Sequence, residues 1–301
     1  MNIENLKTFI TLSELKNFTQ TADRYYIVQS TVTNRIMELE KELGKKLFIR
    51  NRKNVELTDE GHHFLTYAKR IVALEASAIE ELSTLHTFSE TLRIGTVNTV
   101  YDCFLMHPIS SFMEQNPDIS LKITIDHSGP LLRMLQDGTI DLAFSYVPLK
   151  KAGFHCMPFD TDELVLVTAP SHTEFSKGIL QSQLPEVHYL YCNFLIQDNG
   201  VFLRDLFPKN YSFAFEIDKL THLLYYLLQG FGSSFLPKKL VENYLADGSL
   251  ISIPLIDFEA PLMHSFLIIP EAKEKNPAIG RFLETIDAQK EVSDPETEEP
   301  A

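Results

Sequence analysis

Polar side chains gather at the start of an amphipathic helical pattern within residues 18–43. Apolar residues recur there at three- and four-residue steps, which places them on one face of a helix: Val32, Ile36, Leu39 and Leu43. The opposite face carries hydrogen-bond donors and acceptors: Ser30, Thr31, Thr33, Asn34 and Arg35. A helix-turn-helix protein presents such groups to base edges from this end of its second helix. An ordinary helical hairpin with a polar outer face has the same pattern.

Two further helical patterns are placed to position this polar face. The first spans Phe18–Tyr26, and its small Ala22 allows a close crossing with the helix that follows. An amphipathic pattern over residues 3–15 presents Leu6 and Phe9 to cover the pair. The short bend between the two later helices favours a tight corner.

A basic hairpin is predicted directly after the helical pair. Strands are expected at Leu47–Arg50 and Val55–Thr58, joined by a charged turn. The basic residues of this region are Lys41, Lys45, Lys46, Arg50, Arg52 and Lys53. Such a hairpin tip suits contact with phosphate groups, which favours the DNA-reading interpretation over the plain hairpin.

These motifs, in this order, resemble the N-terminal domain of LysR-type transcriptional regulators. The segments that carry the resemblance are ADRYY, QSTVTNRIMELEKELG, LFIR and LTDEG. The family more often has other residues at five positions: Thr21, Tyr25, Val28, Ser30 and Asn34. The resemblance therefore implies the winged helix-turn-helix fold but not the operator sequence.

The residues expected to contact DNA belong to the second helix and the hairpin. The base or phosphate contacts expected from the helix are Gln29, Ser30, Thr31, Thr33, Asn34 and Arg35. The hairpin is expected to hold the DNA backbone through Arg50, Arg52 and Lys53.

The charge of the chain is distributed unevenly. Its 301 residues, 44% of them apolar, are enough for two or three domains with cores of their own. The net charge is -14, yet residues 1–58 hold ten Lys or Arg against seven Asp or Glu, whereas residues 91–301 hold fifteen against twenty-eight. The acidity therefore belongs to the later part of the chain and does not argue against DNA binding by the first part.

Cysteine usage and the N-terminus predict a cytoplasmic protein. Cys103, Cys156 and Cys192 form an odd set without CxxC spacing, which is typical of a reducing compartment. The opening residues MNIENLKTF lack the features of a secretory signal, and no stretch has the roughly 20 apolar residues of a membrane span.

One long helix is predicted from about Asp59 to Phe88, capped by Thr58. Its apolar residues form two rows, Phe64, Ile71, Ala78 and Leu85 beside Leu65, Ala68, Val72, Ile79 and Leu82. Such a seam needs a partner, either a second helix or the chain's own domains. Glu75 lies within the seam and is expected to weaken it. The resemblance implies a linker helix over residues 59–90 that pairs two subunits.

Residues 91–290 change to short apolar strands alternating with helices. The first set predicts a parallel sheet with helices on both faces, and the second set a similar α/β lobe. The resemblance implies an effector-binding domain similar to periplasmic binding proteins. Lobe 1 is expected at about residues 91–160 plus 267–290 and lobe 2 at about 161–266, with crossings near Asp160 and Leu267. Residues 291–301 form an acidic tail that we expect to be disordered.

An effector is expected between the lobes, where the carboxyl ends of strands meet. The residues at such positions are Asn98, Thr99, Val100, Ser128, Tyr146, Asn193, Phe194, Phe231 and Ser233. Those that precede helices offer backbone N–H groups to an anion, or serve as plain helix caps.

Other chemistry has weak support in the sequence. The QGFGSSF segment lacks the third glycine of a nucleotide loop, and no metal-ligand spacing surrounds His62 and His63. No GxSxG elbow occurs, so we expect neither an enzyme nor a cofactor. Cys103 and Cys192 lie near strand ends, where a redox switch is possible but buried inert thiols are commoner.

The sequence therefore predicts a LysR-type regulator that binds promoter DNA and a small-molecule effector. Its expected partners are double-stranded DNA, the effector, further copies of itself as a homodimer or homotetramer, and RNA polymerase. Two alternatives stay open: a two-lobed small-molecule-binding protein or enzyme with no DNA role, and an autorepressor without an effector.

Overall fold

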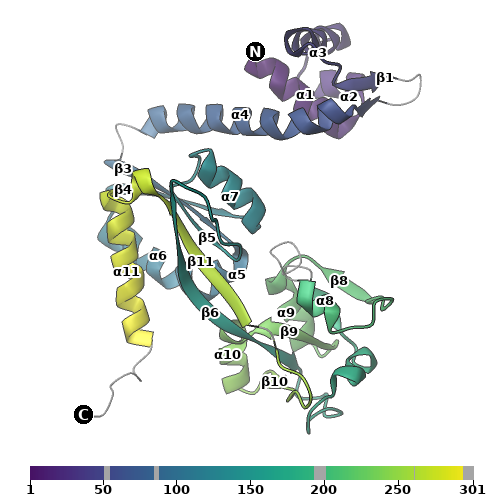
Figure 1. Ribbon diagram of the computed structural model, residues 1–301, viewed down its shortest axis with the longest axis vertical. Coiled ribbons are helices and arrows are strands. Elements are labelled where there is room, and N and C mark those ends of the chain that lie inside the picture. Colours follow the sequence, from purple (N-terminus) through teal and green to yellow (C-terminus); the bar gives the residue numbers. More distant parts are fainter. Residues whose placement is uncertain (51–54, 85–87, 193–200, 261, 294–301) are drawn as a thin grey trace. The chain divides into compact units, whose positions relative to one another are not determined.

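The computed structural model divides the chain into two compact units, unit 1 (Met1–Thr87) and unit 2 (Phe88–Ala301). It describes residues 1–50, 55–84, 88–192, 201–260 and 262–293. Figure 1 gives the order of the helices and strands. None of the helices in these ranges has both the length and the apolar content needed to cross a membrane.

Unit 1 consists of four helices and a two-stranded hairpin. Its elements are α1 (Ile3–Leu15), α2 (Phe18–Arg24), α3 (Gln29–Leu43), β1 (Phe48–Arg50), β2 (Val55–Leu57) and α4 (Asp59–Thr84). The predicted helical pair and hairpin are confirmed, and β1 pairs with β2 in antiparallel register. The long helix begins where expected and is described as far as Thr84, because residues 85–87 lie outside the described ranges.

One apolar core holds unit 1 together. Leu6 and Phe9 of α1 and Ile36 of α3 are completely buried in it, and the Phe9 ring meets Phe48 of β1 edge to face at 5.4 Å. Burying each such side chain contributes about 1.5–3 kcal/mol. The first half of α4 contributes Ala68 to the same core. The apolar sides of α1, α3 and this half of α4 therefore face inward.

The hairpin is attached to α3 through a buried carboxylate. Glu40 accepts hydrogen bonds from the amides of Leu47 at 2.9 Å and Phe48 at 3.4 Å and from the Lys46 ammonium at 2.7 Å. Burial alone would raise the pKa of Glu40. The hydrogen bonds and the Lys46 charge outweigh burial and hold that pKa below its ordinary value.

The start of α4 lies against the residues that lead into β1. The Thr58 hydroxyl accepts from the Gly61 amide at 2.9 Å, so the predicted helix cap is confirmed, and it donates to the Lys46 carbonyl at 2.7 Å. A Cβ at Gly61 would lie 2.2 Å from the Leu47 carbonyl oxygen. Glycine is therefore required where α4 passes this close to the hairpin.

Unit 2 contains two apolar cores, which define two lobes. Lobe 1 begins with β3 (Glu90–Thr96), α5 (Asn98–Val100), a π-helical turn η1 (Tyr101–Leu105), α6 (Met106–Gln115), β4 (Ile119–Ile125), α7 (Ser128–Gln136) and β5 (Leu142–Ser145). The strands form a parallel set in the order β4, β3, β5. Helix α6 connects β3 to β4, and α7 connects β4 back across β3 to β5. Because these two crossovers run in opposite directions and such connections are right-handed, α6 and α7 lie on opposite faces of the sheet (Figure 1).

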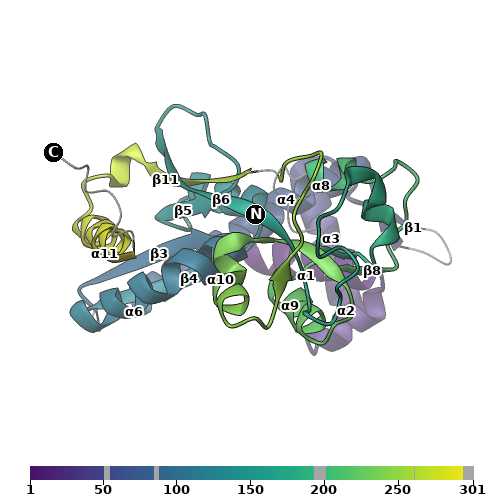
Figure 2. The same ribbon diagram turned by 90° about the horizontal axis from the view of Figure 1, so that it is seen from below.

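Two long antiparallel strands run from lobe 1 into lobe 2, β6 (Phe154–Thr168) and β11 (Leu262–Pro270). Figures 1 and 2 show them side by side. The end of β6 leaves β11 and pairs with β9 (Ser233–Pro237) from Leu164 onward. In β11, Met263 packs in the lobe 2 core, whereas Leu267 pairs with Phe144 and packs in the lobe 1 core. The second crossing thus precedes Leu267.

Lobe 2 surrounds the other core. Its remaining elements are η2 (Gln181–Glu186), β7 (Leu190–Cys192), α8 (Val201–Asp205), β8 (Phe215–Ile217), α9 (Leu220–Leu228), α10 (Lys238–Ala246) and β10 (Ile251–Ser252). The strands β7 and β8 are parallel, whereas β9 and β10 pair antiparallel with β6, so lobe 2 is an α/β unit with both kinds of strand pairing. Helix α10 was not predicted.

The chain returns to lobe 1 through η4 (Glu271–Lys273) and α11 (Pro277–Ser293). Phe282 of α11 packs edge to face on Phe112 of α6, with ring centroids 5.4 Å apart. The expected disorder from residue 291 is wrong for residues 291–293, because they continue α11. Residues 294–301 lie outside the described ranges.

Replacing Glu40 by Gln should lower the free energy of unfolding by about 1–3 kcal/mol at pH 7, because the Lys46 pair and one charged acceptor are lost. The folded pKa of Glu40 lies below that of an unfolded glutamate, about 4.3. Its stabilisation is therefore complete above about pH 5 and disappears as the pH falls through the folded pKa. Urea unfolding followed by circular dichroism at several pH values measures both effects.

Glu42→Gln is the matched control for this measurement. Glu42 lies on the same helix but is half exposed, and it pairs with the N-terminal ammonium. Its replacement should change stability little. Equal losses in the two variants, or a difference that grows on acidification, would contradict the assignment to Glu40.

Candidate nucleic-acid interface and ligand cleft

The first turns of α3 present the polar face that the sequence predicted. Gln29, Ser30 and Asn34 are exposed, and Thr31 and Thr33 are half-buried. The opposite face is buried in the unit 1 core. Within the described part of the chain, no side chain caps the start of α3 at Val28. Its first backbone N–H groups therefore join the side chains as donors for an anionic partner.

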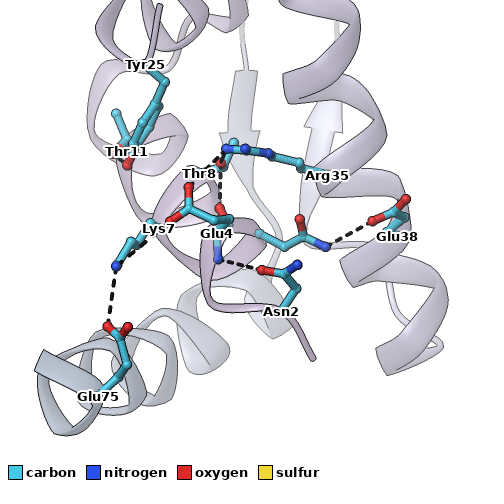
Figure 3. A network of polar contacts seen from close by, with 10 residues as sticks. Asn2, Glu4, Lys7, Thr8, Thr11, Tyr25, Arg35, Glu38 and Glu75 are labelled. Atoms are coloured by element: carbon cyan, nitrogen blue, oxygen red, sulfur yellow. Dashed lines mark hydrogen bonds and ion pairs between the residues drawn. The ribbon is translucent and has the colours of Figure 1, made fainter. Parts of the chain in front are cut away.

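Arg35 does not extend freely from this face. Its Nη1 lies 3.0 Å from the Thr8 hydroxyl and 3.5 Å from a carboxylate oxygen of Glu4, both on α1, and the side chain is only 22% exposed (Figure 3). The guanidinium is thus oriented by α1. Spacing along α3 identified the face but gave no sign of these partners about thirty residues earlier.

The same polar network reaches α4. Lys7 of α1 lies 3.9 Å from Glu4 and 3.3 Å from Glu75, as Figure 3 shows. Glu75 was expected to weaken an intersubunit seam, but its carboxylate faces α1 of its own unit. The pair joins the helix that supports α3 to the middle of α4.

The basic hairpin is described only in part. Arg50 pairs with Val55 through the backbone, whereas Arg52 and Lys53 lie outside the described residues. Lys46 is paired with Glu40, and Lys45 Nζ lies 3.6 Å from Glu60. Two of the basic residues counted in this region are therefore already partly neutralised.

The predicted seam of α4 divides into two parts. Phe64, Leu65, Ala68, Ile71 and Val72 pack against the core of unit 1. In the second part, Ile79 and Leu82 are 58% and 67% exposed within unit 1, and Leu74, which was not counted in the seam, is 49% exposed beside them. Leu85 lies outside the described residues. The chain's own core therefore covers the first half of the predicted seam but not the second.

A narrow crevice lies at the ends of strands in unit 2. Its volume is about 30 Å³, and its walls are formed by Val97, Asn98, Thr99, Ile125, Asp126, His127, Tyr146, Asp218, Lys219 and Leu220. Three predicted residues, Asn98, Thr99 and Tyr146, meet here. Asp126 and His127 follow β4 and Asp218 follows β8, so the strand-end rule applied to these strands would have found them.

A second crevice adjoins the first through Thr99 and Tyr146. Its volume is about 10 Å³, and its other walls are Val100, Phe104, Asp160, Asp162, Met263 and Ser265. The predicted Val100 belongs here. Both lobes contribute, because Met263 packs in the core of lobe 2 and Val100 in that of lobe 1.

The remaining predicted effector residues lie elsewhere. Ser128 is completely buried, and its hydroxyl accepts from the Tyr146 amide at 3.1 Å, so it positions a wall residue. Ser233 is buried at the start of β9 opposite Thr168, and Phe231 is exposed beside Tyr226. Neither lines the two crevices. Asn193 and Phe194 lie outside the described residues.

Lys239 of α10 contacts β6, one of the two strands that join the lobes. Its Nζ lies 3.1 Å from Asp160 and 4.4 Å from the centroid of the Phe104 ring. Burial raises the pKa of Asp162, although the Lys239 and Glu163 amides donate to it. In this wall of the second crevice, the Lys239 ammonium therefore lies close to the carboxylates of Asp160 and Asp162.

The Cys103 and Cys192 thiols lack the surroundings of a reactive thiol. Burial, with the Asp162 and Asp102 carboxylates nearby, raises the pKa of Cys103 to about 12. The reactive thiolate is then scarce at neutral pH. Cys192 is buried in the lobe 2 core. Among the residues with described positions, no group of three or more His, Cys, Asp or Glu side chains is placed to hold a metal ion.

Comparison with known proteins gives two family matches. Residues 3–62 match the model of the bacterial regulatory helix-turn-helix protein of the lysR family, and residues 86–290 match the LysR substrate binding domain. The transcriptional regulator CitR of Bacillus subtilis is 26% identical over 290 residues, which cover 94% of this chain and 98% of CitR. A probable hydrogen peroxide-inducible genes activator of Mycobacterium avium is 28% identical over 67% of this chain and 64% of its own.

Solved structures share the fold along nearly the whole chain. CbnR in complex with its target DNA has a TM-score of 0.67 at 21% identity and covers 96% of this chain and 99% of its own. The virulence activator AphB of Vibrio cholerae has a TM-score of 0.58 at 19% identity, with the same coverage. The predicted fold class, a helix-turn-helix domain followed by an α/β effector-binding domain, is confirmed. With the two family models matching most of its length, the chain belongs to the LysR family of transcriptional regulators.

Proposed function

We propose that this regulator binds double-stranded promoter DNA through the polar face of α3 and the basic hairpin. The observation that carries the proposal is the division of α3 into a fully buried apolar face and a polar face whose first turns are accessible. The contact residues are Gln29, Ser30, Thr31, Thr33, Asn34, Arg50, Arg52 and Lys53. Arg35 belongs to the same set, with Glu4 and Thr8 orienting its guanidinium.

The exposed second half of α4 supports self-association. Leu74, Ile79 and Leu82 expose apolar surface that a second copy of α4 would bury. A dimer presents two α3 helices, and a partly palindromic DNA site matches this symmetry. We propose residues 59–90 as the linker, a homodimer or homotetramer as the active form, and the cytoplasm as its location, where RNA polymerase is the further partner.

We further propose that the two crevices mark a small-molecule effector site within residues 91–290, between lobe 1 and lobe 2. The larger one, about 30 Å³, has the volume of about one water molecule. An effector therefore enters only when the lobes separate, and β6 and β11 are the strands that must bend. A ligand with different affinity for the two arrangements shifts their populations and so changes the DNA complex.

A regulatory role is favoured over catalysis, because the family is one of transcriptional regulators. The charged groups in the crevices have mixed sign, with Asp126 and Asp218 beside Lys219. An effector that carries both donors and acceptors fits this lining better than a highly charged ion. An autorepressor without an effector is the second reading, and a ligand screen distinguishes the two.

Thr33→Ala should weaken binding to the DNA upstream of the protein's own gene by about 1–3 kcal/mol and leave random DNA unaffected, because a base contact is lost. Lys53→Ala should weaken both DNAs alike and lower the slope of log affinity against log salt by about 1. Fluorescence anisotropy over a salt series measures both quantities. Thr66→Ala, an exposed threonine on α4, is the control. Equal effects of Thr33→Ala on both DNAs would overturn the assignment of base contact.

Thr99→Val should weaken effector binding about tenfold, because Thr99 lines both crevices and the change removes its hydroxyl while keeping the side-chain shape. The measurement is the rise in melting temperature caused by central metabolites that stabilise the wild type. Thr161→Val is the matched control, since this exposed threonine on β6 bonds to His264 and lines neither crevice. The effector site is misplaced if both variants respond alike, and a wild type that responds to no metabolite favours the autorepressor.

A further inference from the structure

The corner between α2 and α3 contains an aromatic residue in an unfavourable backbone conformation. Tyr26 has φ +54°, and Lys16 is the other non-glycine residue with positive φ in the described ranges. The left-handed conformation costs an ordinary L-residue about 1–2 kcal/mol, and glycine and asparagine tolerate it best. A tyrosine is therefore an uncommon residue at this position.

The conformation is imposed by the corner itself. The amide of Tyr26 donates to the Asp23 carbonyl at 3.1 Å, and the amide of Ile27 donates to the Ala22 carbonyl at 3.0 Å. The neighbouring Tyr25 faces inward, where its hydroxyl lies 2.8 Å from that of Thr11 on α1 (Figure 3). These bonds fix the turn, so that Tyr25 is used internally and Tyr26 faces outward.

The ring of Tyr26 contributes nothing visible to the stability of unit 1. Its side chain is 98% exposed. Among the described residues it has no hydrogen bond from the hydroxyl and no ring contact. The left-handed backbone is explained by the end of α2 and its two hydrogen bonds, whereas the outward position of the ring has no such explanation within unit 1.

Tyr26 lies beside the polar start of α3, which indicates a role for its ring in binding. It lies two residues before Val28, which is 66% exposed at the start of α3, and the exposed Gln29 and Ser30 follow. These are the first residues of the proposed DNA-contacting face. A partner protein would need a broader apolar patch than one ring and Val28 provide. The phosphates and sugars that border a DNA groove accept a hydrogen bond and a flat ring together.

We propose that Tyr26 is a DNA-backbone contact: its ring lies against a sugar beside the groove entered by α3, and its hydroxyl donates to a phosphate oxygen. This inference rests on the proposed DNA binding by α3. The contact is uncharged and reads no base. It therefore adds affinity on any duplex and releases no counterion.

Tyr26→Asn separates the stability of the corner from DNA binding, because the two should change in opposite directions. Asparagine relieves the left-handed strain, so exchange of the α2 and α3 amides in the full-length protein should slow by about fivefold. Its side chain is too short to reach the phosphate. Affinity for upstream and random duplexes should fall alike, by about tenfold, with an unchanged salt slope.

Two further variants complete the experiment. Tyr26→Phe keeps the ring and the strain, so affinity should fall by about fivefold while amide exchange stays at the wild-type rate. Tyr25→Phe is the matched control, in which the internal bond to Thr11 is lost, so that exchange accelerates while the affinity of the folded protein for DNA is retained. Hydrogen exchange and anisotropy on the same full-length samples give all of these values.

The outcomes distinguish this inference from the function on which it rests. A wild type that binds neither duplex defeats DNA binding by α3, and the inference with it. If the wild type binds and Tyr26→Asn binds equally well, the contact is absent although the proposed function stands. Loss confined to the upstream duplex, or a reduced salt slope, would overturn an uncharged backbone contact.

Discussion

The shared burial of three helix faces determines which surfaces of unit 1 remain available. The apolar sides of α1, α3 and the first half of α4 enter one core, with Phe9 and Ile36 completely buried. What stays outside is the polar start of α3 and the apolar side chains Leu74, Ile79 and Leu82 in the second half of α4. Glu40 fixes the hairpin to α3, and the Lys7–Glu75 pair joins α1 to α4. A single small core thereby orients both proposed interaction surfaces of the unit.

Unit 2 combines two cores with two continuous strands. Because β6 and β11 pass from one core to the other, each lobe keeps its own packing while the strands between them are shared. The second crevice lies at this passage, and the first adjoins it through Thr99 and Tyr146, which form walls of both. Their volumes are about 30 Å³ and 10 Å³, so the space between the lobes is largely filled by side chains. Lys239, between Asp160 and Phe104, adds a charged contact at the same place.

Local patterns were sufficient for elements whose neighbours are near in sequence. The spacing of Val32, Ile36 and Leu39 correctly predicted α3, and the charged turn correctly predicted the hairpin. The residue spacing could not predict elements that form through long-range pairing. The early part of β6 is a strand because it pairs with β11 more than a hundred residues later. The strand-end rule found Thr99 and Tyr146 but also selected Ser233, which the pairing of β9 with β6 buries. Arg35 was assigned to the correct helix, although its partners on α1 were invisible to periodicity.

We propose that paired α4 helices place two copies of the α3 polar face in the major groove. Dimethyl sulfate footprinting of the full-length protein on the DNA upstream of its own gene tests this most directly, because the reagent reports the major-groove N7 of guanine. Two protected patches are expected, with centres that lie about 10 base pairs, or a multiple of this, apart. A single protected patch, or protection confined to the minor groove, would contradict it.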